Sequence, residues 1–136
     1  MEIEYMFICD HACADQHRKP CLIGIFDHIN APAFPFTQIA MSVAVAISGS
    51  AGEHFTVTVT LERPNGDVLA EAPTASHAFD RTGRECLAFQ FGNVQFVDAG
   101  RYVFKASSGS GKGPATSRSL QVQKRAPATS PVAITH

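Results

Sequence analysis

The 136-residue chain has no tryptophan, only two tyrosines and no ten-residue stretch with the apolar period of an α-helix. Helical bundles and folds that alternate strands with helices are therefore excluded. The longest apolar run, near residues 39–47, is far shorter than the roughly 20 residues that cross a bilayer. Glu2 and Glu4 stand where a secretory signal carries positive charge. We therefore expect a soluble, cytoplasmic chain without a membrane partner.

The chain also lacks a charge excess, because its formal net charge is −1. A balance of this kind favours neither nucleic acid nor an anionic membrane as a partner. The charge is uneven, since residues 99–136 hold six basic and no acidic residues, while residues 1–98 hold five basic and twelve acidic ones. No aromatic residues are interleaved with the basic ones near the C-terminus, so we do not expect binding of single-stranded nucleic acid.

Motifs for catalysis are missing as well. The glycine-serine stretch 107–113 contains Lys112, but Gly113 follows it where a phosphate loop needs serine or threonine at the start of a helix. Asp10, Asp27 and His28 fall on the predicted first hairpin without a nucleophile motif beside them. We therefore expect a protein that is not an enzyme.

Short strands separated by turn signals fill the chain instead. Residues 55–61 alternate strictly between apolar and threonine side chains, and Asn65-Gly66 supplies the positive φ angles of a tight hairpin turn. Pro32 and Pro35 forbid helix and interior strand, so we expect an extended crossing from one sheet to the other. The further strands are expected at residues 3–12, 21–29, 39–47, 68–69, 76–79, 85–91, 102–106 and 117–124.

A corner completes the pattern, because a strand breaks at Asp98-Ala99-Gly100 and resumes at Arg101-Tyr102. A tyrosine at this spacing is typical of the tyrosine corner of immunoglobulin-like domains, whose hydroxyl bonds back to the upstream backbone. We predict an all-β, antiparallel immunoglobulin-like β-sandwich of about seven to nine strands over residues 1–124. Residues 125–136 are rich in proline and small residues and are predicted to form a flexible tail.

The opening hairpin resembles that of a family of small bacterial β-sandwich proteins of unknown function. The residues that carry the resemblance are Cys9-Asp10, Lys19, Leu22-Ile23-Gly24-Ile25-Phe26-Asp27 and Ala31-Pro32-Ala33-Phe34-Pro35, together with the corner at residues 98–102. The resemblance implies a compact β-sandwich. It supplies no reaction, ligand or catalytic residue.

The densest set of possible metal ligands lies in the same hairpin: Cys9, His11, Cys13, His17 and Cys21. Alternate strand residues share a face, so the two thiols and the imidazole of Cys9, His11 and Cys13 point the same way. If Cys13 lies opposite Cys21, thiolates and imidazoles can converge, which suits zinc. A disulfide between Cys13 and Cys21 is also geometrically possible. Reduced cysteines, however, commonly serve as small buried hydrophobic residues, and this interpretation is preferred.

The sequence thus favours a non-catalytic protein-interaction or structural module that needs no cofactor. Sheets leave unpaired edges, and an exposed edge strand is a docking surface for a protein partner or a second copy of the chain. The alternative is a zinc-binding or thiol-redox protein that uses the cysteine and histidine residues of the first hairpin.

Overall fold

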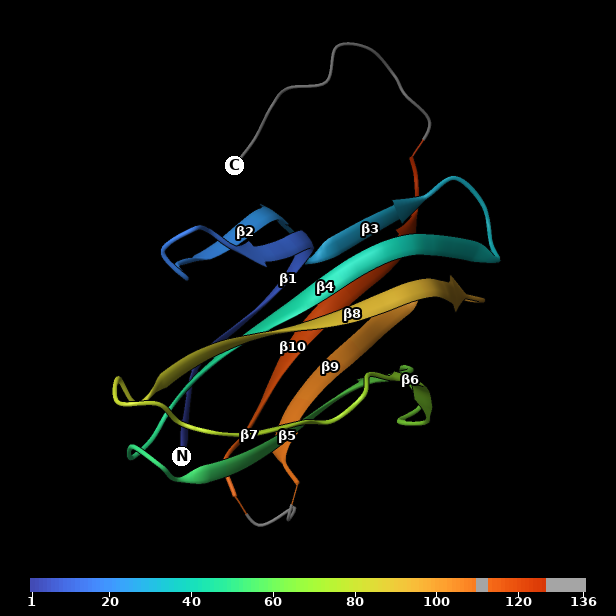
Figure 1. The fold of residues 1–136 in the computed structure, drawn as a ribbon. Helices are drawn as coiled ribbons and strands as arrows, with labels where there is room; N and C mark the ends of the chain where they lie inside the picture. Colours follow the sequence, from blue (N-terminus) through green and yellow to red (C-terminus); the bar gives the residue numbers. More distant parts are fainter. Residues whose placement is uncertain (110–112, 127–136) are drawn as a thin grey trace.

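The computed structural model describes residues 1–109 and 113–126, which fold into two packed β-sheets without a helix. The four-stranded sheet has the order β2 (Pro20–Ile25), β1 (Glu2–Ala14), β4 (Phe36–Ser48), β8 (Arg84–Phe96). The six-stranded sheet has the order β3 (His28–Ala31), β10 (Ala115–Lys124), β9 (Gly100–Ser108), β5 (His54–Glu62), β6 (Val68–Glu71), and β7 (Ala75–Ala78) also pairs with β5. The two sheets lie face to face (Figure 1). The all-β sandwich predicted from the sequence is confirmed.

Strand β5 shows why this sequence forms a sandwich. Phe55, Val57, Val59 and Leu61 are buried, while the threonines between them are half-buried on the other face. The alternation therefore places one face of β5 against the facing sheet, as the sequence predicts.

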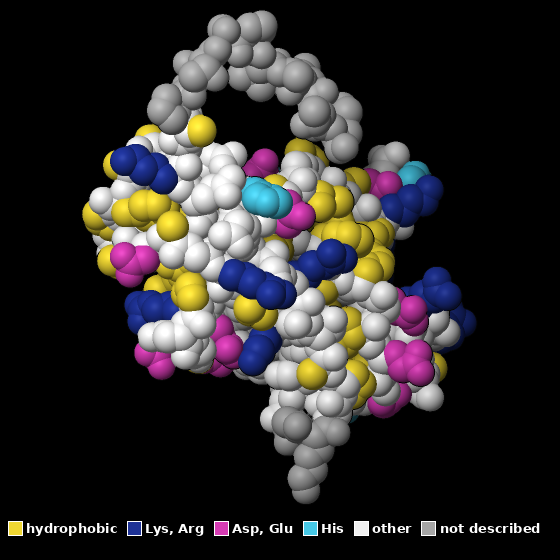
Figure 2. Space-filling view, turned by 180° about the vertical axis from the view of Figure 1, so that it is seen from behind, with side chains coloured by type: hydrophobic (Ala, Val, Ile, Leu, Met, Phe, Trp, Pro, Cys, Tyr) yellow, Lys and Arg dark blue, Asp and Glu magenta, His cyan; other side chains and the backbone are white. Residues whose placement is uncertain are grey.

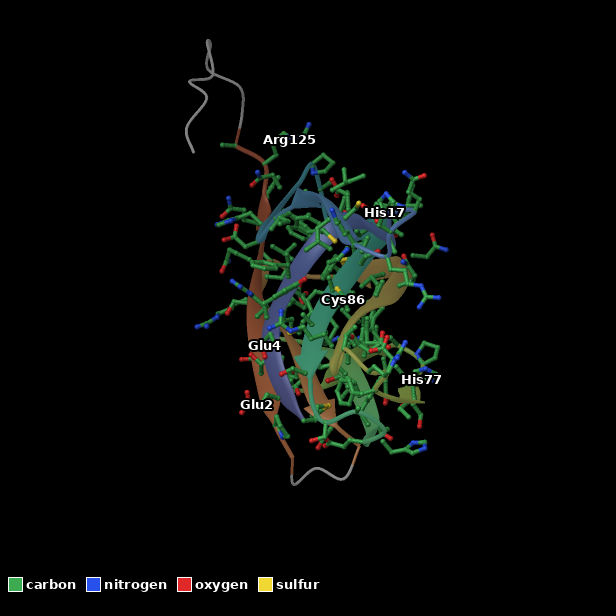
Figure 3. All side chains as sticks on the ribbon, turned by 60° about the vertical axis from the view of Figure 1, so that its left-hand side comes forward. Glu2, Glu4, His17, His77, Cys86 and Arg125 are labelled. Atoms are coloured by element: carbon green, nitrogen blue, oxygen red, sulfur yellow. The ribbon has the colours of Figure 1, made fainter. Side chains whose placement is uncertain are left out.

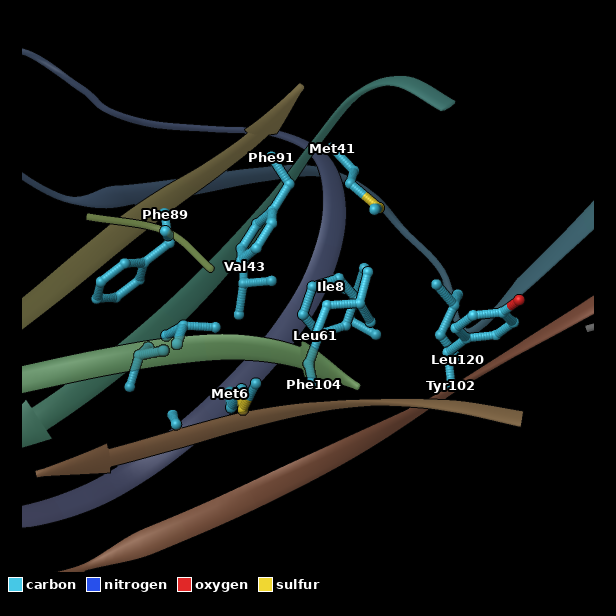
Figure 4. Close-up of a cluster of buried hydrophobic side chains, with 14 of the residues drawn as sticks. Met6, Ile8, Met41, Val43, Leu61, Phe89, Phe91, Tyr102, Phe104 and Leu120 are labelled. Carbon is cyan, nitrogen blue, oxygen red and sulfur yellow. The ribbon is translucent and has the colours of Figure 1, made fainter. Parts of the chain in front are cut away.

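The core lies between the sheets and joins residues from distant parts of the chain. Phe91 of β8 meets Phe104 of β9 edge to face, with ring centroids 5.1 Å apart. Met41 and Val43 of β4 and Leu61 of β5 close the same cluster, and all three are fully buried (Figure 4). The packing of aromatic and branched side chains holds the two layers together.

The predicted corner is present. The Tyr102 hydroxyl donates a hydrogen bond of 2.8 Å to the carbonyl oxygen of Asp98. Its ring also meets Phe96 edge to face at a centroid distance of 4.8 Å. The corner therefore ties β9 to the end of β8, while the assignment to the immunoglobulin-like class stays a prediction.

One predicted strand is wrong. Residues 21–29 were expected to form a single strand buried on both faces, but the chain leaves β2 after Ile25 and starts β3 at His28 in the other sheet. Gly24 has a φ of +70°, and the Asp10 carboxylate occupies the place that a Cβ would take there. Because β2 lies at the edge of its sheet, Ile23 and Ile25 are 58% and 56% exposed.

The last strand ends at Lys124, close to the predicted end of the domain. The predicted flexible tail falls outside the described residues from position 127 onward, as do residues 110–112 of the glycine-serine loop. Within the described part of the chain, no helix has the length and apolar character needed to cross a membrane.

Candidate functional site

The predicted metal ligands fall into separate places. Cys9 is fully buried in a small cluster with Ala12 and Ala44, and its thiol lies 3.7 Å from the carbonyl oxygen of Ser42. It therefore acts as a small apolar residue. His17 lies in the turn after β1, where its ring Nε2 lies 3.3 Å from the side-chain amide nitrogen of the neighbouring Gln16.

Cys13 and Cys21 are brought together. They are direct partners in the β1–β2 ladder, and the same register places His11 opposite Ile23. Burial, followed by the charge and hydrogen bond of the neighbouring Cys13, raises the pKa of the Cys21 thiol. In the described residues, no three histidine, cysteine, aspartate or glutamate side chains are grouped so that they could hold a metal ion. A zinc site therefore stays a prediction.

The fourth cysteine, Cys86, lies on the outer face of the four-stranded sheet, well away from the turn that carries His17 (Figure 3). Its thiol accepts a hydrogen bond of 3.8 Å from the Tyr5 hydroxyl. Burial raises the pKa of Cys86, so the thiol stays protonated and unreactive at neutral pH.

The edge of β1 that faces away from β4 is occupied within the chain. The Arg118 side chain donates a hydrogen bond of 2.7 Å from Nε to the Met6 carbonyl oxygen, and its guanidinium lies 4.7 Å from the centre of the Phe7 ring. The Phe26 amide then caps the Ile8 carbonyl at 3.0 Å. Seen from behind, the molecule shows lysine and arginine side chains among hydrophobic ones (Figure 2). Arg118 therefore shields the backbone of β1 from a further strand.

A shallow groove of about 500 Å³ lies along this seam. Its lining mixes Glu4 and Asp27 with Arg118 and with the hydroxyl side chains of β10. Asp27 contacts His28, but both side chains are largely exposed. The groove is open, and its acidic and basic side chains are exposed.

Most other strand edges are short or kinked. β3, β6 and β7 have four residues each, and β2 has six. β2 also begins at Pro20, which has no N–H to donate, and bends at Gly24. Short edges, prolines and bends are the means by which proteins prevent unwanted strand pairing.

The edge strand β8 differs from these. It has 13 residues, and in the described part of the chain it pairs with β4 alone. The sequence carries no charged residue between Glu85 and Asp98. Charged side chains, which commonly block pairing at an edge, are thus missing over nearly the whole strand.

The register shows which backbone groups of β8 point away from β4. The Gly49 amide donates a hydrogen bond of 2.9 Å to the Gly83 carbonyl, one step beyond the ladder in which Ile47 pairs with Glu85. Backbone groups alternate in direction along an antiparallel strand, so odd-numbered residues from 83 to 91 face β4. The N–H and C=O groups of Cys86, Ala88 and Gln90 therefore point away from the sheet. We call this stretch, residues 84–92, the β8 edge.

The side chains around the β8 edge leave the backbone accessible. Phe89 and Phe91 point into the core and are each 4% exposed, whereas Ala88 and Gln90 lie on the outer face and are exposed. The Gln90 side chain accepts a hydrogen bond of 2.8 Å from Ser42 on the neighbouring strand. From Cys86 to Gly92 the edge is therefore uncharged, and the buried rings of Phe89 and Phe91 support it.

Sequence reasoning predicted docking at an exposed edge but did not identify the strand. The signal that marks it is the run of uncharged residues from Cys86 to Val97. Arg118 was counted with the basic residues of the final third, and its contact with β1 was not predicted.

Comparison with protein families gives one match. The model described as a family of unknown function (DUF6941) covers residues 4–123, which include β8 and the first hairpin. No curated protein matches the chain. The prediction that the chain belongs to a family of unknown function is thus confirmed. The specific hairpin motif and the bacterial source of the family stay predictions.

Proposed function

Since the chain belongs to the DUF6941 family of unknown function, its role must be inferred from its own surface, and we propose a non-catalytic protein-interaction module. The module accepts a further strand, from a protein partner or from itself, on the β8 edge. One observation carries the proposal: within the described residues, β8 is a 13-residue edge strand that pairs with β4 alone and carries no charged residue beyond Glu85.

Strand addition explains what the edge can bind. Each of Cys86, Ala88 and Gln90 presents one backbone donor and one acceptor, and an extended peptide can satisfy all of them. Affinity then comes from main-chain hydrogen bonds, while the exposed Ala88 and Gln90 side chains select the neighbouring residues of the added strand.

The test compares two substitutions of Ala88. Ala88→Pro removes an N–H that points away from β4 and has no backbone partner among the described residues, so we expect the fold to be retained while strand addition is blocked. Ala88→Val keeps the N–H and is the matched control. In native mass spectrometry of the protein purified from its own host, we expect wild type and Ala88→Val to carry a second chain and Ala88→Pro to lose it. A wild-type mass of one chain would contradict the proposal.

A second candidate function is thiol-disulfide exchange, and the contact between Cys13 and Cys21 favours it. A small-molecule disulfide would form a mixed disulfide with one thiolate, and the other thiolate would displace it, leaving a protein disulfide and two released thiols. Incubation with oxidised glutathione tests this idea: the wild type should lose two hydrogen masses, and Cys13→Ser should instead retain glutathione. A wild-type mass without change would contradict it.

Zinc binding by the same residues is tested in the same host-purified sample, kept free of chelator. A mass excess of one zinc that disappears in Cys13→Ser would support it. For the cellular location we propose the cytoplasm, where thiols such as the four free cysteines stay reduced.

A further inference from the structure

We infer that the strand accepted by the β8 edge is the β8 edge of a second copy of this chain, in an antiparallel arrangement about a two-fold axis at Ala88. This inference rests on the proposed function and names the partner.

The position of the axis follows from the length of straight strand. Gly92 and Asn93 are consecutive exposed residues, and Asn93 has a φ of +53°, so β8 bends there. The straight part of the strand therefore spans residues 84–92, and its midpoint is Ala88. A two-fold axis at the midpoint pairs the longest possible stretch.

The same axis satisfies the backbone. In an antiparallel pair, groups that point outward must face groups that point outward. With the axis at Ala88, Cys86 lies opposite Gln90 of the second copy, and Ala88 lies opposite its own counterpart. The outward-facing residues Cys86, Ala88 and Gln90 of both copies then belong to hydrogen-bonded pairs, and Arg84 lies opposite Gly92 in the same way.

Charge and packing also suit a second copy. The two charged residues of the edge, Arg84 and Glu85, meet Gly92 and Phe91 of the other copy, so no like charges are placed together. On the core side, the half-buried Leu87 lies opposite Phe89 of the second copy and gains an apolar neighbour. On the outer face, the small Ala88 side chains let the two strands approach without a clash.

The resulting contact is closed. Two four-stranded sheets join into one continuous sheet, and the same edge is used by both copies, so no further copy can add at β8. The structure thus assigns a dimer rather than a fibre.

Sedimentation equilibrium of the purified chain over a range of concentrations tests the dimer. We expect two-chain mass for the wild type and for Ala88→Val. Ala88→Pro should raise the dissociation constant by about 100-fold, because each copy loses one hydrogen bond of the new ladder and leaves the facing carbonyl group without a donor. A wild-type mass of one chain at all concentrations, or a two-chain mass for a folded Ala88→Pro, would overturn the inference.

A charge exchange at the axis gives a second test that does not depend on proline. Ala88→Lys and Ala88→Glu each place two like charges opposite each other on the exposed outer face. The dissociation constant of each variant dimer should therefore be about fivefold higher than that of the wild type. An equimolar mixture should recover association as a Lys–Glu pair. Recovery identifies the axis at Ala88, and its absence would overturn it.

The failure of this inference differs from the failure of the proposed function. If the host-purified protein carries one copy and a different chain, and Ala88→Pro loses that chain, strand addition at β8 stands and the second copy is excluded. If neither a copy nor another chain is present, both fail.

Discussion

The Gly49 amide donates a hydrogen bond of 2.9 Å to the Gly83 carbonyl, and this bond shows the direction of the backbone groups along residues 83–91 of the chain. Because it extends the β4–β8 ladder by one step, it assigns the odd-numbered residues to β4 and the even-numbered residues to the open side. The free edge of the sheet is thus fixed by a contact between two glycines at its end.

Gly83 should not tolerate a side chain. Its φ is +65°, and a Cβ there would lie 2.4 Å from the Gly49 carbonyl oxygen. Gly83→Ala should therefore lower the free energy of unfolding by about 1–3 kcal/mol, measured by urea denaturation. Gly52 is the control, since its φ is +81° but no atom lies within 4 Å of an added Cβ. An equal loss in Gly52→Ala would contradict the role of the clash.

The tyrosine corner should contribute measurable stability. Tyr102→Phe removes the hydroxyl that donates to Asp98 and leaves the ring in place, so we expect a loss of about 1 kcal/mol in urea denaturation. Tyr5→Phe is the comparison, because the Tyr5 hydroxyl bonds only a thiol in the described residues, at 3.8 Å. If both substitutions lower the free energy of unfolding equally, the hydrogen bond from Tyr102 to Asp98 does not stabilise the fold more than the weak Tyr5 bond does.

Arg118 should both stabilise the fold and protect β1 from association. Arg118→Ala removes the bond to Met6 and the contact with Phe7, with an expected loss of about 1–2 kcal/mol. It also uncovers the β1 backbone, so association should increase in sedimentation experiments on an Ala88→Pro background. Arg101→Ala is the matched control, since Arg101 bonds a serine side chain at 2.8 Å. Increased association in both variants would contradict protection by Arg118.

The Cys21 thiol should react slowly at neutral pH. Burial, followed by the neighbouring Cys13, raises its pKa, so less thiolate is present at a given pH than for an ordinary cysteine. Cys13→Ser removes the influence of the Cys13 thiol and so lowers the pKa of Cys21. The pH dependence of the rate at which iodoacetamide alkylates Cys21 should therefore shift to lower pH. Peptide mass spectrometry between about pH 6 and pH 10 measures the rate. Cys86→Ser should leave the profile unchanged, and an unchanged profile in Cys13→Ser would refute the coupling.

Local patterns in the sequence predicted much of the fold. The alternation over residues 55–61 and the corner at Tyr102 depend on neighbours within a few residues, and the structure contains both. The sequence left open whether Cys13 lies opposite Cys21, and the register shows that it does. These features need no knowledge of which strands meet across the molecule.

The remainder depends on contacts between distant segments. Residues 21–29 are apolar enough for one strand, but Gly24 and the pairing of His28 with β10 divide them between two sheets. The strand order, which places β8 at the end of its sheet, identifies the β8 edge as free. The contact of Arg118 with β1 shows that the β1 edge is covered. Periodicity cannot reveal which edge is covered, because the covering side chain lies 112 residues from Met6.

Amide hydrogen exchange at the β8 edge tests the central claim most directly. In dilute chain, the Ala88 and Gln90 amides should exchange at least tenfold faster than those of Leu87 and Phe89, which bond β4. At concentrations where two-chain mass is observed, Ala88 and Gln90 should become as protected as their neighbours. Protection of Ala88 and Gln90 in the dilute chain would show that the edge is not free. Unchanged exchange in the associated sample would show that association occurs elsewhere.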